Sequence, residues 1–99
     1  MLAFRPNCEC CDKDLLPEST EAMICSFECT FCAGCVSGIL QNVCPNCGGE
    51  LVRRPVRPTD KRGVYPASTD RVYKPLLGER LDRHMALVKR YAGITPSQR

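Results

Sequence analysis

Hydrophobic residues recur along the C-terminal part of the chain at the spacing of a helix. Leu77, Leu81, Met85 and Val88 lie three or four residues apart, which predicts an amphipathic helix over residues 77–92. Acidic residues early in this segment and basic residues late in it suit the helix dipole. An amphipathic helix must bury its apolar face. We therefore expect this face to pack on the rest of a monomer or to form the seam of a homodimer.

Shorter apolar runs in the first half predict a hairpin followed by a helix. Residues 22–24 and 29–31 are predicted as strands joined by a turn, and residues 33–40 as a short helix. Residues 53–76 are rich in Pro and Arg, which predicts an extended basic connector with polyproline-like backbone. Glycine and proline end the last helix, so residues 93–99 are expected to form a flexible tail.

No apolar run approaches the roughly 20 residues that a bilayer-spanning helix needs. The N-terminus also lacks the apolar stretch of a secretory leader, because Arg5 and Pro6 interrupt it. We therefore expect no membrane association and a cytoplasmic location. Thiols stay reduced in that compartment, so clustered cysteines there bind metal more often than they form disulfides.

Cysteine dominates the composition. The chain has 99 residues and 43% hydrophobic residues, but nine of those are cysteines, so little remains for an apolar core. Domains this small commonly need a metal or another cross-link to hold their fold. All nine cysteines lie between Cys8 and Cys47. The sequence therefore predicts a small metal-stabilised α+β domain over residues 1–52.

Eight of the cysteines form four closely spaced pairs. These are Cys8 and Cys11, Cys25 and Cys29, Cys32 and Cys35, and Cys44 and Cys47. Two thiolates of one tight turn can bind the same metal ion, and four thiolates complete the tetrahedral shell of a structural zinc site. We therefore expect two structural Zn²⁺ ions, while the spacing alone does not distinguish zinc from iron.

Cys10 and His84 are two further candidate ligands. Cys10 offers a third sulfur beside Cys8 and Cys11, as an alternative ligand or a reactive thiol, but a spectator role is expected. His84 is able to complete a metal shell, yet it lies on the predicted C-terminal helix among charged neighbours. We expect it on a solvated helix face.

Residues 29–36 (CTFCAGCV) and 44–47 (CPNC) resemble the RING finger, with cysteine in place of the family's histidine at residue 29. The resemblance implies a cross-brace treble clef of knuckle, β-hairpin, short helix and knuckle. It also implies two interleaved ligand sets. In these sets, site one would be Cys8, Cys11, Cys32 and Cys35, and site two would be Cys25, Cys29, Cys44 and Cys47.

Residues 1 to about 75, including 65–72 (YPASTDRV), also look like a family of short bacterial cysteine-rich proteins catalogued as a domain of unknown function. That resemblance implies a bacterial origin and no particular activity. The chain departs from ubiquitin-ligase RINGs because Cys10 and Gly48 stand where those proteins carry an aliphatic residue and a basic residue. Ligase activity is therefore a minor alternative.

Charge separates the two halves of the chain. Residues 1–50 carry two basic and seven acidic groups, whereas residues 51–99 carry twelve basic and four acidic groups. A basic segment over 53–90 makes a nucleic-acid-associated regulator the second hypothesis. In that hypothesis, basic side chains of the connector contact phosphates, and the candidates are Arg53, Arg54, Arg57, Lys61 and Arg62.

The leading hypothesis is a non-catalytic zinc protein that acts as a protein-interaction adaptor. The sequence contains no nucleophile–base pair, paired carboxylates or phosphate loop, and four-thiolate zinc sites leave no open coordination position. We therefore expect no enzyme activity and a protein partner.

Overall fold

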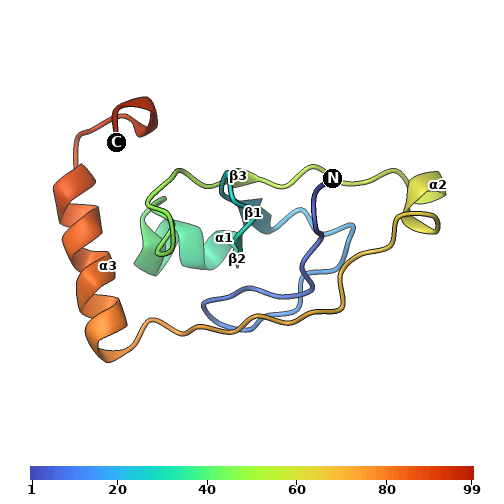
Figure 1. Ribbon diagram of the computed structural model, residues 1–99, viewed down its shortest axis with the longest axis horizontal. Helices are drawn as coiled ribbons and strands as arrows, with labels where there is room; N and C mark the ends of the chain where they lie inside the picture. Colours follow the sequence, from blue (N-terminus) through green and yellow to red (C-terminus); the bar gives the residue numbers. More distant parts are fainter.

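The computed structural model describes residues 1–99 (Figure 1). A small antiparallel sheet has the strand order β2-β1-β3, and its strands are β1 (Ala22–Ile24), β2 (Thr30–Cys32) and β3 (Val52–Arg53). Ala22 pairs with Cys32, and Ile24 pairs with Thr30 on one side and Val52 on the other. The predicted hairpin is confirmed. The third strand was not predicted, because two residues are too few to show a pattern.

The chain continues from β2 directly into a short helix. It comprises α1 (Ala33–Cys35) and the π-helical turn η1 (Val36–Leu40), so the helix predicted over 33–40 is confirmed. Gln41 then takes a positive φ of 50° and ends it. Val36 and Leu40 are the buried residues of η1, which places its apolar side against the sheet and the cysteines.

The core is small and rich in cysteine. Eleven buried residues form it, and four of them are Cys8, Cys25, Cys32 and Cys44. The others are mainly aliphatic residues from elements far apart in the sequence, together with Phe31, which is 1% exposed. Leu76 belongs to the same core, so the chain returns to the sheet region well after its last cysteine.

Residues 53–76 run along the cysteine-rich region and include α2 (Thr59–Arg62), a short helix that the sequence did not predict. The backbone N–H of Lys74 donates to the Glu9 carbonyl oxygen at 2.8 Å. The side chain of Asn7 donates to the Val72 carbonyl oxygen at 2.9 Å. Figure 1 shows this segment side by side with the N-terminal loops.

Two arginines that are candidates for phosphate contacts lie over Phe4, and of these Arg54 is buried and Arg57 half-buried. Arg54 is 1% exposed, and its guanidinium lies 4.5 Å from the Phe4 ring centre. It donates to the carbonyl oxygens of Arg5 and Leu16, each at 3.1 Å. Arg57 lies over the same ring at 4.4 Å. The prediction that Arg54 contacts phosphate is therefore wrong, because its side chain is buried and its guanidinium donates to carbonyl oxygens within the protein.

The predicted C-terminal helix is present as α3 (Gly78–Tyr91), and a 3₁₀ turn, η2 (Pro96–Gln98), follows it. Gly93 takes a positive φ of 75° just after the helix ends, a conformation that glycine adopts without strain. Figure 1 shows α3 at one end of the molecule and α2 at the other. No helix has the length and apolar character needed to span a membrane.

The buried face of α3 differs from the predicted one. Leu77 is 70% exposed and Met85 is 37% exposed, whereas His84 is 1% exposed. Leu81 packs against the core, and the His84 Nε2 lies 3.1 Å from the Leu40 carbonyl oxygen. The solvated position predicted for His84 is therefore wrong, and the helix docks through a face centred on Leu81 and His84.

Candidate metal centre

The first thiol cluster joins the start of the chain to the end of the hairpin. The sulfurs of Cys8, Cys11, Cys32 and Cys35 all lie within 4.8 Å of one another, and those of Cys11 and Cys32 are 3.7 Å apart. A tetrahedral zinc site with Zn–S bonds of about 2.3 Å has sulfurs separated by about 3.8 Å. The four thiols therefore fit one metal ion.

Local backbone geometry presents these four sulfurs. The Asp12 N–H donates to the Cys8 carbonyl oxygen at 2.9 Å, which closes the turn between Cys8 and Cys11. Cys32 is the last residue of β2, and Cys35 is the last residue of α1. The change from strand to helix therefore directs both thiols toward the N-terminal turn.

The second cluster contains Cys25, Cys44 and Cys47, whose sulfurs also lie within 4.8 Å of one another. The Gly48 N–H donates to the Cys44 carbonyl oxygen at 2.8 Å, and Gly48 has a φ of 77°. This tight turn brings the last two cysteines together. Three thiols of this kind can hold a metal ion with one further ligand.

Backbone N–H groups point at the sulfurs of the second cluster. The Phe27 N–H lies 3.4 Å from the Cys25 sulfur, and the Gly49 N–H lies 3.4 Å from the Cys47 sulfur. Hydrogen bonds from outside the ligand set orient metal-binding side chains and tune their basicity. The two turns therefore supply ligands and the donors that support them.

Cys29, the remaining residue of the predicted eight, lies outside the tight three-sulfur group. Its carbonyl oxygen accepts from the Cys25 N–H at 3.2 Å, so it sits at the base of the same turn. Burial raises the pKa of its thiol, a hydrogen bond from Asn46 opposes that rise, and the neighbouring Cys25 adds to it. Its sulfur is thus close to Cys25 but is not clustered with all three other thiols.

The ninth cysteine, Cys10, belongs to neither cluster. It is half-buried, and burial raises the pKa of its thiol while a hydrogen bond with Cys35 lowers it. Cys10 therefore lies beside the first cluster, and its neighbour Cys11 is the residue that joins the group of four.

Burial controls the protonation of the thiols. It raises the pKa of Cys8 to about 11 and also raises the pKa of Cys35 and Cys44. Cys32 is also buried, but hydrogen bonds from Cys35, Cys11 and Cys8 outweigh that effect and lower its pKa. Metal ligation requires thiolates. A cation that binds Cys8, Cys35 or Cys44 must therefore displace a proton whose loss burial opposes, whereas the hydrogen bonds to Cys32 favour its thiolate.

Polar residues around the second cluster were missed by sequence reasoning. The Asn46 side chain donates to the Glu9 carboxylate at 3.0 Å and accepts from the Arg80 guanidinium at 3.1 Å. Glu9 is 2% exposed. The position of Asn46 between two cysteines of one turn was the available signal, whereas nothing in the sequence pattern marks Glu9 or Arg80.

Comparisons with known proteins place the chain among short relatives. No solved structure matches it. An uncharacterized protein of Rhizobium meliloti (strain 1021) is 69% identical over 75 residues, which cover 76% of this chain and 89% of the relative. The family described as "Protein of unknown function (DUF1272)" matches residues 1–57, which include both thiol clusters. The chain therefore belongs to the DUF1272 family.

Proposed function

We propose that the chain is a non-catalytic protein whose two structural zinc ions hold a surface for a protein partner. The observation that carries this proposal is the alternation of the two thiol clusters along the chain. Cys8 and Cys11 join Cys32 and Cys35, whereas Cys25, which lies between these pairs, joins Cys44 and Cys47. Two metal ions bound in this order would link the cysteine-bearing segments of residues 8–47 to one another, as in a RING-like cross-brace treble clef.

Cys29 is the proposed fourth ligand of the second site. It lies on the same hairpin turn as Cys25, and the two thiols interact. A zinc ion at the three clustered sulfurs needs one more ligand to complete a tetrahedron. The proposed sets are therefore Cys8, Cys11, Cys32 and Cys35 for site one, and Cys25, Cys29, Cys44 and Cys47 for site two.

The structural role of the metals follows from the ligand count. Catalytic zinc keeps one position open for water or substrate, whereas four thiolates close the shell. In this chain the thiols also form part of the core, and Cys8 and Cys44 are fully buried. The proposed metals therefore replace missing apolar packing.

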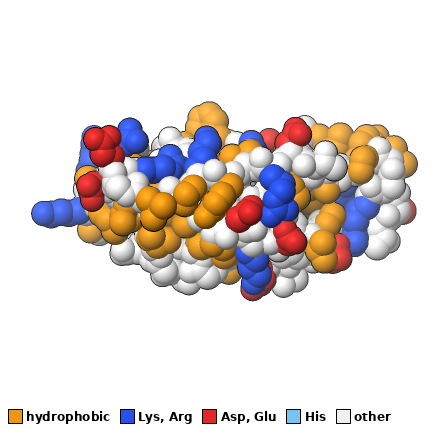
Figure 2. Space-filling model, turned by 90° about the horizontal axis from the view of Figure 1, so that it is seen from below, with side chains coloured by type: hydrophobic (Ala, Val, Ile, Leu, Met, Phe, Trp, Pro, Cys, Tyr) orange, Lys and Arg blue, Asp and Glu red, His pale blue; other side chains and the backbone are white.

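Exposed apolar side chains support a protein partner. Residues 64–77 carry Val64, Tyr65, Tyr73 and Leu77, which are 70%, 45%, 55% and 70% exposed. Figure 2 shows hydrophobic side chains gathered in a band across one face, with Lys and Arg side chains beside it. Exposed apolar surface that is gathered into a large patch marks interaction sites in soluble proteins.

The test is affinity capture from the native host with the zinc-loaded full chain and mass spectrometry of the retained proteins. We expect a protein that binds the wild type and is lost with Tyr73→Ser combined with Leu77→Ser. Both side chains are exposed, so this variant should keep the fold and its zinc. Phe27→Ser, an exposed residue in the hairpin turn, is the matched control.

Two results would count against the adaptor. One is a set of retained proteins that does not differ between wild type and the double variant. The other is nucleic-acid affinity at physiological salt that falls steeply as salt rises, which would favour the regulator hypothesis. Of the five basic residues proposed for phosphate contacts in that hypothesis, Arg54 is buried and cannot serve.

A further inference from the structure

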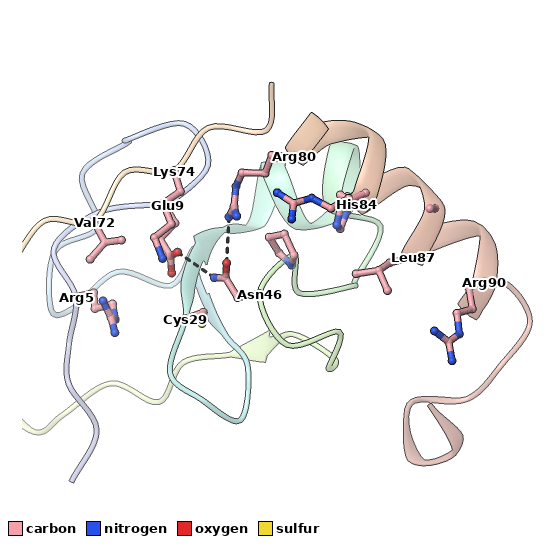
Figure 3. Close-up of a pocket in the computed structure, with 13 residues that line it drawn as sticks. Arg5, Glu9, Cys29, Asn46, Val72, Lys74, Arg80, His84, Leu87 and Arg90 are labelled. Atoms are coloured by element: carbon pink, nitrogen blue, oxygen red, sulfur yellow. Dashed lines mark hydrogen bonds between the residues drawn. The ribbon is translucent and has the colours of Figure 1, made fainter. Parts of the chain in front are cut away.

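A cavity of about 740 Å³ lies between α3, the second cysteine turn and residues 72–74. Figure 3 shows its labelled side chains arriving from these separate segments, with Arg5, Glu9 and Lys74 on one side and Leu87 and Arg90 on the other. Ligand pockets commonly have volumes of about 300–1,000 Å³. The cavity is therefore large enough for a small organic molecule.

The charged side chains of the cavity wall are mostly cationic. Five cationic side chains line it, against the carboxylate of Glu9 and the thiol of Cys29, a proposed ligand of the second metal site. The cations are Arg5, Lys74, Arg80, Arg83 and Arg90. None of them forms an ion pair, since the four ion pairs of the protein involve Lys13, Arg62 and Arg71. Like charges brought together without partners favour an anion among them.

Buried polar atoms in the wall also lack partners. The Nε atoms of Arg5 and Arg80 are inaccessible to solvent and make no hydrogen bond, and the same holds for Nδ1 of His84. The His84 ring is 1% exposed, and its other nitrogen faces the Leu40 carbonyl oxygen. Buried polar groups in native proteins are normally satisfied. Three of the four exceptions in this protein belong to residues that line this cavity, and the fourth is the Nε of Arg99.

Existing contacts hold the centre of the cavity in place. Figure 3 shows Arg80, Asn46 and Glu9 connected in a row by hydrogen bonds. This row connects α3 to the second cysteine turn. The side chains of Lys74 and Arg90 lie on either side of the row and make no side-chain hydrogen bond. The wall also includes apolar side chains, among them Val72 and Leu87. The cavity thus offers separated cations and an apolar surface.

We propose that this cavity binds a small organic molecule that carries a diphosphate group, of the size and chemistry of a nucleoside diphosphate. Guanidinium and ammonium groups form strong charge-assisted hydrogen bonds with phosphate oxygens. The apolar side chains Val72 and Leu87 contact the organic part. The cations line one concave site, which fits a small ligand better than a long nucleic-acid strand.

The experiment is calorimetric titration of ADP into the zinc-loaded full chain. We expect saturable binding with one ligand per chain, and weaker binding of inorganic pyrophosphate, which lacks the organic part. Lys74→Gln and Arg90→Gln should each weaken ADP binding by about tenfold, the effect of losing one hydrogen bond to a charged group. Both side chains are exposed, so neither change should disturb the fold.

Arg53→Gln is the matched control, because it removes the same charge from an exposed position outside the cavity. The proposal is overturned if ADP does not saturate, if Arg53→Gln weakens binding as much as Arg90→Gln, or if a single-stranded oligonucleotide binds and ADP does not. Zinc content is measured on every sample. A variant that keeps its zinc but loses ADP therefore tests the cavity separately from the metal sites.

Discussion

Residues 1–57, the cysteine module, and residues 58–99, the C-terminal segment, are held in different ways. The module contains every cysteine, all three strands and both thiol clusters. Only two buried residues of the chain, Leu76 and His84, lie in the C-terminal segment. The module should therefore depend on metal, whereas the segment depends on a few contacts with the module.

This difference predicts two steps of unfolding. Local regions with few buried contacts open at lower free energy than the core. The attachment of α3 rests on Leu81, on the His84 bond to Leu40, and on the Arg80 bond to Asn46. Opening of the C-terminal segment should leave the cysteine module intact, while loss of metal from the module should release both.

The largest effect is expected from Cys44→Ser. Cys44 is fully buried and belongs to the second cluster, so the change removes a ligand and a core contact. Structural zinc supplies roughly 10–16 kcal/mol of apparent binding free energy in small domains. We expect loss of amide-exchange protection across residues 8–47, as after chelation.

The matched control for Cys44→Ser is Cys10→Ser, because Cys10 lies outside both clusters. It should retain full metal content and protection. If Cys10→Ser loses a zinc ion and Cys11→Ser does not, the ligand set of the first site is wrong. Native-like protection in the metal-free wild type would contradict the dependence of the module on metal.

A smaller effect is expected from Leu81→Asp, which places a carboxylate where α3 meets the core. Burial of an unpaired polar group should destabilise the docked helix by a few kcal/mol. Amide protection should fall in α3 and persist in residues 8–47. Met85→Asp, on the more exposed side of the helix, is the control and should change little.

Sedimentation of the Leu81→Asp variant sharpens this result. Docking within one chain predicts an unchanged molecular mass with lower helix protection. A dimer in the wild type that becomes a monomer in the variant would instead identify the helix as a seam between two copies. Equal protection in Leu81→Asp and wild type would mean that Leu81 does not hold the helix.

The smallest effect is a pH dependence of helix docking through His84. Burial lowers the pKa of His84 below its ordinary value of 6.5, and the nearby Arg80 lowers it further against the opposing effect of the Leu40 and Ile39 backbone. The undocked state therefore binds a proton more readily. Docking free energy should be fully present above about pH 6.5 and should decrease as the pH falls through the unfolded pKa toward the lower folded one.

Amide exchange in α3 at about pH 7.5 and about pH 6, corrected for the intrinsic exchange rates, measures this dependence. His84→Gln provides the control, because the glutamine amide can donate to the Leu40 carbonyl oxygen and does not titrate. The variant should show less pH dependence than the wild type. An equal dependence in both proteins would assign it to groups other than His84.

The sequence predicted those features that depend on local spacing. Cysteine pairs indicated two clusters, and seven of the eight expected residues lie in them. The hairpin and the bounds of α3 followed from short-range patterns. Cys29 was placed in a complete set by resemblance to the RING finger, and its distance from the other thiols depends on the turn geometry.

Features set by tertiary contacts could not be predicted in this way. The burial of His84 depends on a carbonyl group 44 residues away in sequence, and Arg54 is buried against Phe4 and two distant carbonyl groups. A hydrophobic pattern predicts surface positions for both residues, because both are polar. On α3 it therefore predicted a buried face that includes Leu77 and Met85 and excludes His84.

Elemental analysis of the purified full chain tests the central claim most directly. The alternating thiol clusters, with Cys29 completing the second one, predict two zinc ions per chain and loss of one from Cys29→Ser. A value near one zinc ion in the wild type, unchanged by Cys29→Ser, would contradict a second metal site that includes this cysteine.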